Sequence, residues 1–139
     1  MNRWQSIWRS YCALPLWVQL WVWVLVAPNV AAFAFLDTEI GVWTAIAIAF
    51  IGVINLPTIY VQRGFSRLLS FPQFVWAPLI VFIAVRLSSV EAMDSGEQWL
   101  GFAVLIVNLI SLVFDVLDFG RWLHGKRDIF GGSDLRSRA

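Results

Sequence analysis

Four long apolar stretches, separated by short polar segments, limit what this chain can fold into. The stretches cover residues 14–36, 41–61, 71–87 and 99–119. A helix needs roughly 20 apolar residues to cross a bilayer, and each stretch is close to that length. Only 14% of the residues are charged and 60% are hydrophobic, whereas soluble domains carry about 25% charged residues. The sequence therefore predicts an all-α membrane protein, a four-transmembrane-helix bundle of two antiparallel hairpins, in one domain over residues 1–139.

The N-terminal segment, residues 1–13, has the pattern of an amphipathic helix. Trp4, Ile7, Trp8 and Tyr11 recur at the spacing of one helix face, and polar side chains occupy the other face. Such a short helix with an aromatic face is typical of a segment that lies in the membrane interface. We therefore expect an interfacial helix before the first membrane-spanning helix.

Two further segments lie between or after the apolar stretches. Residues 62–73 carry Arg63 and Arg67 four positions apart and are expected to form an amphipathic link that rests on the membrane surface. The stretch that follows is the shortest of the four, and Pro78 interrupts it near its start. Residues 120–139 are expected to form a basic cytoplasmic tail.

The basic residues predict how the chain is oriented. Loops on the cytoplasmic side of a membrane protein carry an excess of Lys and Arg. If the N-terminus is cytoplasmic, nine of the ten Lys and Arg residues lie on that side, and Arg86 alone lies toward the other. The acidic residues Asp37, Glu39, Glu91, Asp94 and Glu97 then fall outside. We expect a multi-pass protein of the bacterial cytoplasmic (inner) membrane with both termini in the cytoplasm.

The chain contains nine Trp residues, a type of residue that membrane proteins concentrate at the lipid–water boundary. Most of them fall near the predicted helix ends. Trp4, Trp8, Trp17, Trp76 and Trp122 are expected at the cytoplasmic boundary, and Trp43 and Trp99 at the outer one.

Polar side chains inside the apolar stretches are the candidate site residues, because each must find a hydrogen-bond partner within the protein. At a rise of about 1.5 Å per residue they form two layers, one near the cytoplasmic ends of the helices and one nearer the outer ends. The cytoplasmic layer consists of Gln19, Asn55, Asp115 and Asp118, and the outer layer of Asn29 and Asn108. Both layers are expected to face the bundle interior.

The last apolar stretch carries the strongest polar signal. Asn108, Ser111, Asp115 and Asp118 share one helix face, because they are spaced 3, 4 and 3 residues apart. The two aspartates lie near the C-terminal end of the predicted helix, where the helix dipole disfavours negative charge. They therefore need cationic partners. The candidates are Arg63, Arg67 and Arg121.

Two interpretations of this polar cluster stay open. In one, Asp115 is a protonatable or cation-binding group, with Asn55 and Gln19 as amide ligands, in a small channel or a proton- or cation-coupled transporter. In the other, the polar side chains are interhelical anchors. The protein then acts by association, as a subunit or assembly factor of a membrane complex or as a homo-oligomer, and its partners are the lipid bilayer, other membrane-protein subunits or another copy of itself. The second is the leading hypothesis.

Enzymatic chemistry and cofactors are not indicated. The single Cys12 excludes an intramolecular disulfide and a thiolate metal cluster. One histidine, His124, cannot provide two imidazole ligands for haem, and the apolar stretches contain no Glu-x-x-His pair of the di-iron type. The net charge of +1 provides no field that would attract nucleic acid. We expect a non-enzymatic protein with no cofactor, no metal site and no nucleic-acid partner.

Overall fold

The computed structural model describes residues 2–89 and 92–125, and no β-strand occurs among them. The α-helices are α1 (Arg3–Cys12), α2 (Leu16–Ala31), α3 (Glu39–Gln62), α4 (Trp76–Ser88) and α5 (Ser95–Leu123), and the 3-10 helices are η1 (Ala32–Ala34), η2 (Arg67–Ser70) and η3 (Pro72–Val75). Four helical segments are long and apolar enough to cross a membrane: Leu16–Ala34, Glu39–Gln62, Arg67–Ser88 and Ser95–Leu123. The prediction of an all-helical chain with four such segments is confirmed. Glu91 and residues 126–139 of the expected tail lie outside the described residues.

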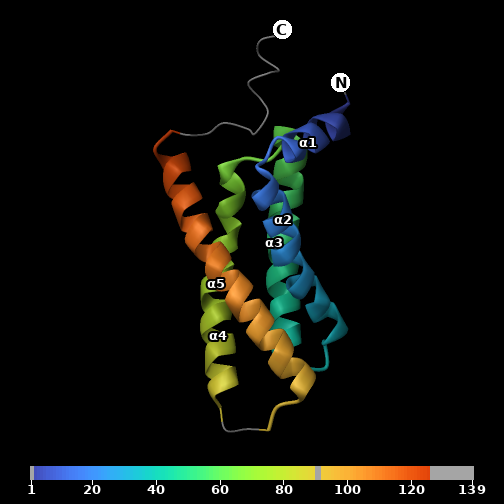
Figure 1. Ribbon diagram of the computed structural model, residues 1–139, viewed down its shortest axis with the longest axis vertical. Coiled ribbons are helices and arrows are strands. Elements are labelled where there is room, and N and C mark those ends of the chain that lie inside the picture. Colours follow the sequence, from blue (N-terminus) through green and yellow to red (C-terminus); the bar gives the residue numbers. More distant parts are fainter. Residues whose placement is uncertain (1, 90–91, 126–139) are drawn as a thin grey trace.

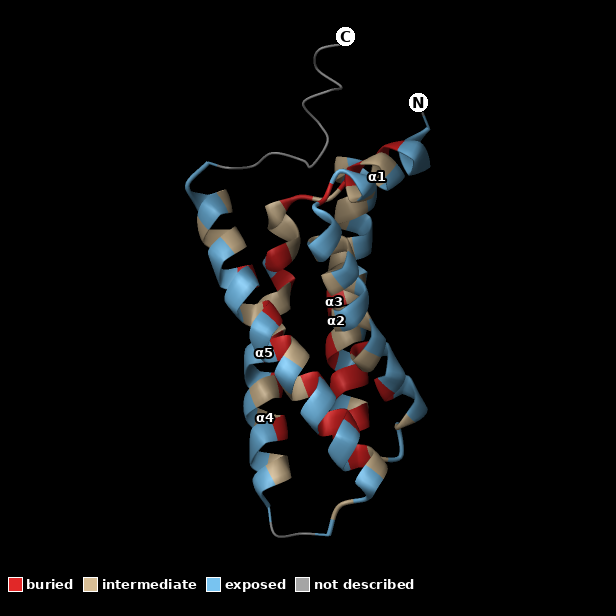
Figure 2. Cartoon of the chain, viewed as in Figure 1, coloured by how far each residue is buried: buried red, intermediate tan, exposed pale blue. Residues whose placement is uncertain are grey.

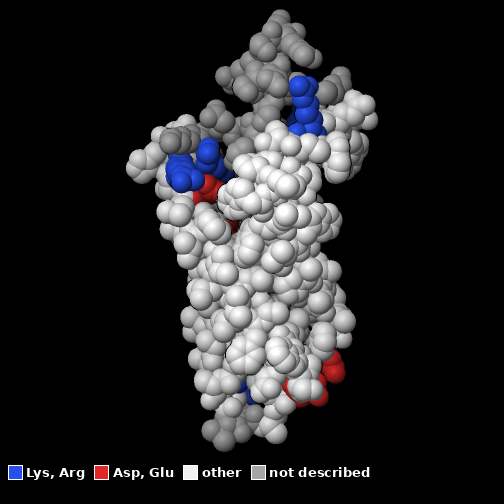
Figure 3. All heavy atoms as spheres, viewed as in Figure 1, with Lys and Arg blue, Asp and Glu red and all other residues white. Residues whose placement is uncertain are grey.

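The two ends of the bundle differ in charge. α1 and the C-terminal part of α5 lie at one end, on opposite sides of the bundle, and the connection between α4 and α5 lies at the other end (Figure 1). Arginine side chains collect at the end with α1, and acidic side chains dominate the opposite end (Figure 3). We call these the basic end and the acidic end. Glu39, Arg86 and Glu97 belong to the acidic end, at the termini of α3, α4 and α5.

Side-chain caps set the N-terminal ends of three helices, because the first backbone N–H groups of a helix have no partner within it. At α1, Asn2 accepts a hydrogen bond from the Trp4 backbone N–H at 3.2 Å. At α3, Thr38 Oγ1 accepts from Gly41 N–H at 3.1 Å. At α5, Asp94 accepts from Gly96 N–H at 2.9 Å, two residues after the described chain resumes at residue 92. Short polar residues thus mark where α1, α3 and α5 begin, whereas α2 and α4 begin without a side-chain cap.

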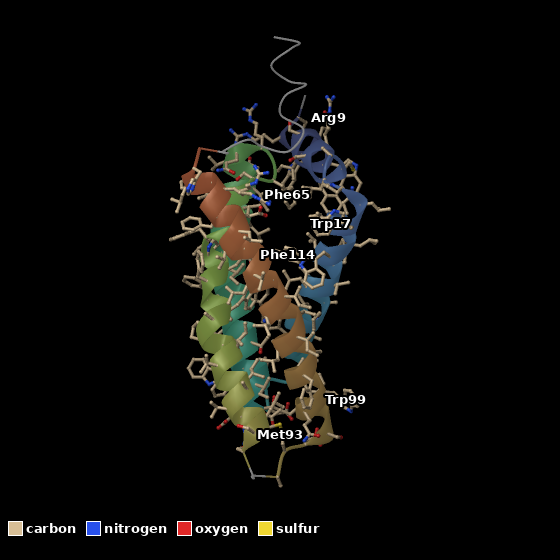
Figure 4. All side chains as sticks on the ribbon, turned by 60° about the vertical axis from the view of Figure 1, so that its left-hand side comes forward. Arg9, Trp17, Phe65, Met93, Trp99 and Phe114 are labelled. Carbon is tan, nitrogen blue, oxygen red and sulfur yellow. The ribbon has the colours of Figure 1, made fainter. Side chains whose placement is uncertain are left out.

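α1 is fixed to the basic end by its polar face. Ser6 and Ser10 are buried, and Ser10 Oγ accepts a hydrogen bond from the Phe65 backbone N–H at 2.8 Å. Figure 4 shows Phe65 close to α1 at this end. Trp4 and Trp8 are 66% and 67% exposed. The helix therefore turns its serines toward the protein and leaves two indole rings outward.

The segment before α4 differs from the expected surface link. Instead of an amphipathic α-helix, residues 67–75 form the two 3-10 helices η2 and η3, and Ser66, Ser70 and Pro72 are buried. Pro72 has no backbone N–H and cannot continue a preceding helix, which explains the break between η2 and η3. The polar groups of η2 contact α3 and α5, so the segment is packed against the bundle on one side and leaves Phe71 54% exposed on the other.

The apolar core is small and includes one tryptophan. Figure 2 shows buried residues along the helix faces that point into the bundle. Trp76 is only 1% exposed, and its indole N–H donates to Gln73 Oε1 at 3.1 Å. Trp76 is therefore a core residue and does not face outward as Trp4 and Trp8 do. The other large buried side chains include Ile40, Ile83 and Val104.

Candidate functional site

Asn29 of α2 and Asn108 of α5, the predicted outer layer, are brought together by the structure. Asn29 Nδ2 donates to Asn108 Oδ1 at 2.8 Å, and Asn108 Nδ2 donates to Asn29 Oδ1 at 3.0 Å. The second N–H of the Asn29 amide donates to the Leu25 carbonyl at 2.8 Å. Both asparagines are 0% exposed. This asparagine pair is a closed amide ring that links the first and last long helices.

The predicted cytoplasmic layer is organised around η2. Arg67, the first residue of η2, pairs with Asp118 of α5 at 3.5 Å between Nε and Oδ1. Ser70, the last residue of η2, faces the Asp115 carboxylate, which also accepts a hydrogen bond from Ser111 Oγ at 3.1 Å. Arg67 and Ser70 are three residues apart, as are Asp115 and Asp118. The first residue of η2 meets the later aspartate and the last residue meets the earlier one, so η2 and α5 run in opposite directions here. α5 therefore holds η2 at both of its ends.

Asn55 contacts the other side of η2. Its Nδ2 donates to the Leu69 carbonyl at 3.2 Å, and Gln73 Nε2 donates to the same carbonyl at 3.4 Å. The Oδ1 atom of Asn55 is buried and has no hydrogen-bond partner among residues 2–89 and 92–125. Asn55 and Asp115 thus belong to one cluster, but they meet through η2 and not through a direct hydrogen bond.

Gln19 lies apart from this cluster. Its Nε2 donates to the Leu14 carbonyl at 2.8 Å and to the Cys12 carbonyl at 3.4 Å. The last carbonyls of a helix lack partners within it. The carbonyls of Cys12, the last residue of α1, and of Leu14, just after it, therefore need another donor. Gln19 therefore stabilises the corner between α1 and α2.

The candidate arginines have different positions. Arg67 and Arg121 both pair with Asp118, and the distance from Arg121 Nη1 to Oδ1 is 3.3 Å. Arg63 ends α3 in a left-handed backbone conformation with φ of 57°, and the described part of the chain records no ion pair between it and either aspartate. Two of the three candidate arginines, Arg67 and Arg121, therefore pair with Asp118. The partners of Asp115 are the hydroxyl groups of Ser111 and Ser70.

A second charged cluster, which the sequence did not predict, lies at the acidic end. Arg86 Nε is 3.2 Å from Glu39 Oε2 and 4.0 Å from Glu97 Oε1. Glu97 is 5% exposed and also accepts from the Ile40 backbone N–H at 3.3 Å. The sequence did contain a signal for this cluster. Glu39 and Glu97 lie in the first turns of their helices and Arg86 lies in a last turn, where each charge is favoured by the helix dipole.

An apolar groove of about 450 Å³ lies between α3 and the segment formed by η3 and α4. Its lining contains no charged side chain. The residues are Trp43, Ile46, Ala47, Phe50, Val75, Pro78, Leu79 and Phe82. Trp43 and Phe82 meet edge to face with ring centroids 6.2 Å apart.

The described residues contain no group of three or more His, Cys, Asp or Glu side chains that could hold a metal ion. The candidate features are therefore the asparagine pair between α2 and α5, the contacts that hold η2 against α5, and the apolar groove. No protein-family model, curated protein or solved structure matches this chain.

Proposed function

We propose that this chain is a polytopic membrane protein that acts by association, as a subunit or assembly factor of a membrane complex or as a homo-oligomer, and not as an enzyme. In this proposal its helices cross a bacterial inner membrane as two antiparallel hairpins. Both termini are cytoplasmic, because the arginines collect at the basic end.

The observation that carries the proposal is how little of α2 is buried. In the most apolar part of Leu16–Ala34, 11% of the residues are buried, against 28% in Arg67–Ser88 and 33% in Glu39–Gln62 and Ser95–Leu123. Asn29 is the buried residue of α2. A helix with so little packing inside its own chain has most of its surface available to another protein.

α2 contacts α5 mainly through aromatic rings. The ring of Phe114 lies 5.9 Å from Trp17 and 6.2 Å from Trp21, measured between centroids, and Figure 4 shows Trp17 and Phe114 beside each other. These contacts and the asparagine pair fix the angle at which α2 is presented. They leave its opposite face uncovered.

The uncovered face has the composition of a helix-packing surface. Leu20, Trp23, Ala27 and Ala31 are exposed and lie 3, 4 and 4 residues apart, which places them on one face. We call them the α2 outward stripe. Ala27 and Ala31 form a small-xxx-small pair, which lets two membrane helices approach closely. The Trp23 indole N–H donates to the Tyr11 hydroxyl at 2.9 Å, so this ring is held in place before any partner binds.

The test compares two exposed alanines, Ala27 on α2 and Ala84 on α4. The wild-type protein, purified in mild detergent, is expected to have the mass of an oligomer or of a complex with another membrane protein. Ala27→Trp should reduce it to the mass of one chain, because the indole blocks close approach, and Ala84→Trp should not. A wild-type protein that purifies as a single chain without a partner would contradict the proposal. So would an equal effect of both variants.

One observation favours the transport alternative. Asp115 is 7% exposed, and its hydrogen bond in the described structure comes from Ser111 rather than from an arginine. Buried carboxylates in membrane-spanning helices often bind protons or cations. We nevertheless favour a structural role, because Asp115 contacts Ser70 at one end of η2 and Asp118 pairs with Arg67 at the other end. We call this the anchor role.

Asp115→Asn and Asp115→Val separate these roles. In the anchor role the asparagine still accepts hydrogen bonds from the serines, so it should reduce stability by less than about 1 kcal/mol, whereas valine should cost about 1–3 kcal/mol by leaving hydroxyls unpaired. Thermal unfolding in detergent measures both. In liposomes, proton and sodium flux should be the same with wild type, with Asp115→Asn and without protein. Wild-type flux that Asp115→Asn abolishes would establish the transport role.

A further inference from the structure

We infer that the groove between α3 and α4 binds one acyl chain of a zwitterionic phospholipid, whose headgroup lies at the Arg86–Glu39 ion pair. This site is separate from the α2 outward stripe and does not depend on a protein partner. The groove is apolar throughout and its volume, about 450 Å³, lies within the range of about 300–1,000 Å³ that is usual for ligand sites.

The groove is short along both of its walls, which favours a thin occupant. The lining residues run from Trp43 to Phe50 on α3 and from Val75 to Phe82 on η3 and α4. At about 1.5 Å per residue, each wall is about 10 Å long. A helix that packed against these walls would meet them over only about two turns. So short a contact falls below the roughly 800 Å² per partner of a stable interface. A single hydrocarbon chain is thin enough to fit.

The same helix faces lead from the groove to the charged pair. Glu39 lies four residues before Trp43, and Arg86 lies four residues after Phe82, so each charge is one turn from a groove residue on the same face. One turn corresponds to about 6 Å along each helix. Trp43 and Phe82, whose rings are in contact, are the groove residues nearest to the charges in sequence. An acyl chain in the groove therefore places its headgroup beside Arg86 and Glu39.

The charges select the kind of headgroup. Guanidinium groups bind phosphate through charge-assisted hydrogen bonds, and because the Arg86 side chain is 17% exposed, a phosphate would meet only the exposed edge of this group. The Glu39 side chain is 66% exposed and can meet an ammonium group, while its Oε2 stays 3.2 Å from Arg86 Nε. Glu97, whose Oε1 is 4.0 Å from the same nitrogen, adds a second negative charge. One arginine and two glutamates together disfavour a headgroup with net negative charge. The site therefore suits phosphatidylethanolamine better than phosphatidylglycerol.

The experiment measures bound lipid by native mass spectrometry of the full chain in mild detergent, with phosphatidylethanolamine and phosphatidylglycerol of identical acyl chains. Wild type should retain one phosphatidylethanolamine and prefer it about tenfold, a difference of about 1.4 kcal/mol. Ile46→Trp, which fills the groove from an exposed wall, should abolish this binding. Val53→Trp is the control, because Val53 is 74% exposed on the same helix and does not line the groove.

Glu39→Gln tests the headgroup site separately. This variant should still bind one lipid but lose the preference for phosphatidylethanolamine. Equal binding by Ile46→Trp and Val53→Trp, or equal binding of the two lipids by wild type, would overturn the inference. If Ile46→Trp instead converts an oligomer to single chains, the groove is a protein contact and the lipid site is wrong. None of these results depends on Ala27, so they are distinguishable from a failure of the association proposal.

Discussion

Replacing Asn108 with leucine should reduce the stability of the protein by about 1–3 kcal/mol, because the substitution leaves the Asn29 amide buried without its partner. Both side chains are 0% exposed, so water cannot replace the lost hydrogen bonds. Leucine has the same branching and number of side-chain heavy atoms as asparagine, but its methyl groups are larger, so the loss combines the unpaired amide with some overpacking. Unfolding in detergent, followed by circular dichroism, measures it. Gln98→Leu on the exposed side of α5 is the control and should change stability little.

A double substitution tests the asparagine pair as a unit. Asn29→Leu together with Asn108→Leu removes both amides, so neither amide is left buried without its partner, and the Leu25 carbonyl loses only its side-chain donor. The double variant should therefore be more stable than the sum of the two single losses implies, by about 0.6–2 kcal/mol. Additive losses would mean that the two amides do not depend on each other in solution.

Gly41→Ala should have the largest effect of any small substitution in this chain. A Cβ at this position would lie 1.9 Å from the Phe35 carbonyl oxygen and 2.6 Å from the carbonyl carbon. These are backbone atoms and cannot rotate away, so the connection between η1 and α3 must move. We expect a loss of more than about 3 kcal/mol, beyond the usual cost of overpacking, or failure to fold.

Two other glycines provide matched controls for Gly41→Ala. At Gly101 a Cβ would meet the Ile40 and Leu87 side-chain ends at 2.9 and 3.1 Å, and these can shift, so the alanine variant should lose less. At Gly120 nothing lies within 4 Å, and alanine should stabilise the helix by up to about 1 kcal/mol. In one detergent, the melting temperature should therefore be lowest for Gly41→Ala, higher for Gly101→Ala and highest for Gly120→Ala. Similar values for the first two would contradict the close approach.

The helices could be predicted because their cause is local. The length of each apolar stretch and a short polar residue before it, such as Thr38 or Asp94, are sufficient to indicate a long helix and its start. The segment of η2 could not be predicted in the same way. Arg63 and Arg67 suggested an α-helical surface link, but the conformation of residues 67–70 depends on partners in α3 and α5 that are distant in sequence.

Depth along a helix predicted which polar residues lie at similar heights but not which of them meet. Asn29 and Asn108 were assigned to one layer and do form a pair. Gln19 was assigned to the layer of Asp115, yet it binds carbonyls at the nearby end of α1, because a local acceptor was within reach of its side chain. The direction in which a side chain points depends on how the helices are rotated, and sequence periodicity fixes that only for strongly amphipathic helices.

The contacts of η2 also imply an order in which the helices can reach their final packing during synthesis. Synthesis from the N-terminus produces Arg67 and Ser70 well before Asp115 and Asp118, the residues of α5 that face them. Until α5 emerges, the third apolar segment lacks the carboxylates that hold its irregular backbone in place. A chain that stops before Ser95 would have three apolar segments but neither aspartate. α5, which leaves the ribosome after the third apolar segment, is therefore the helix that completes the packing of that segment.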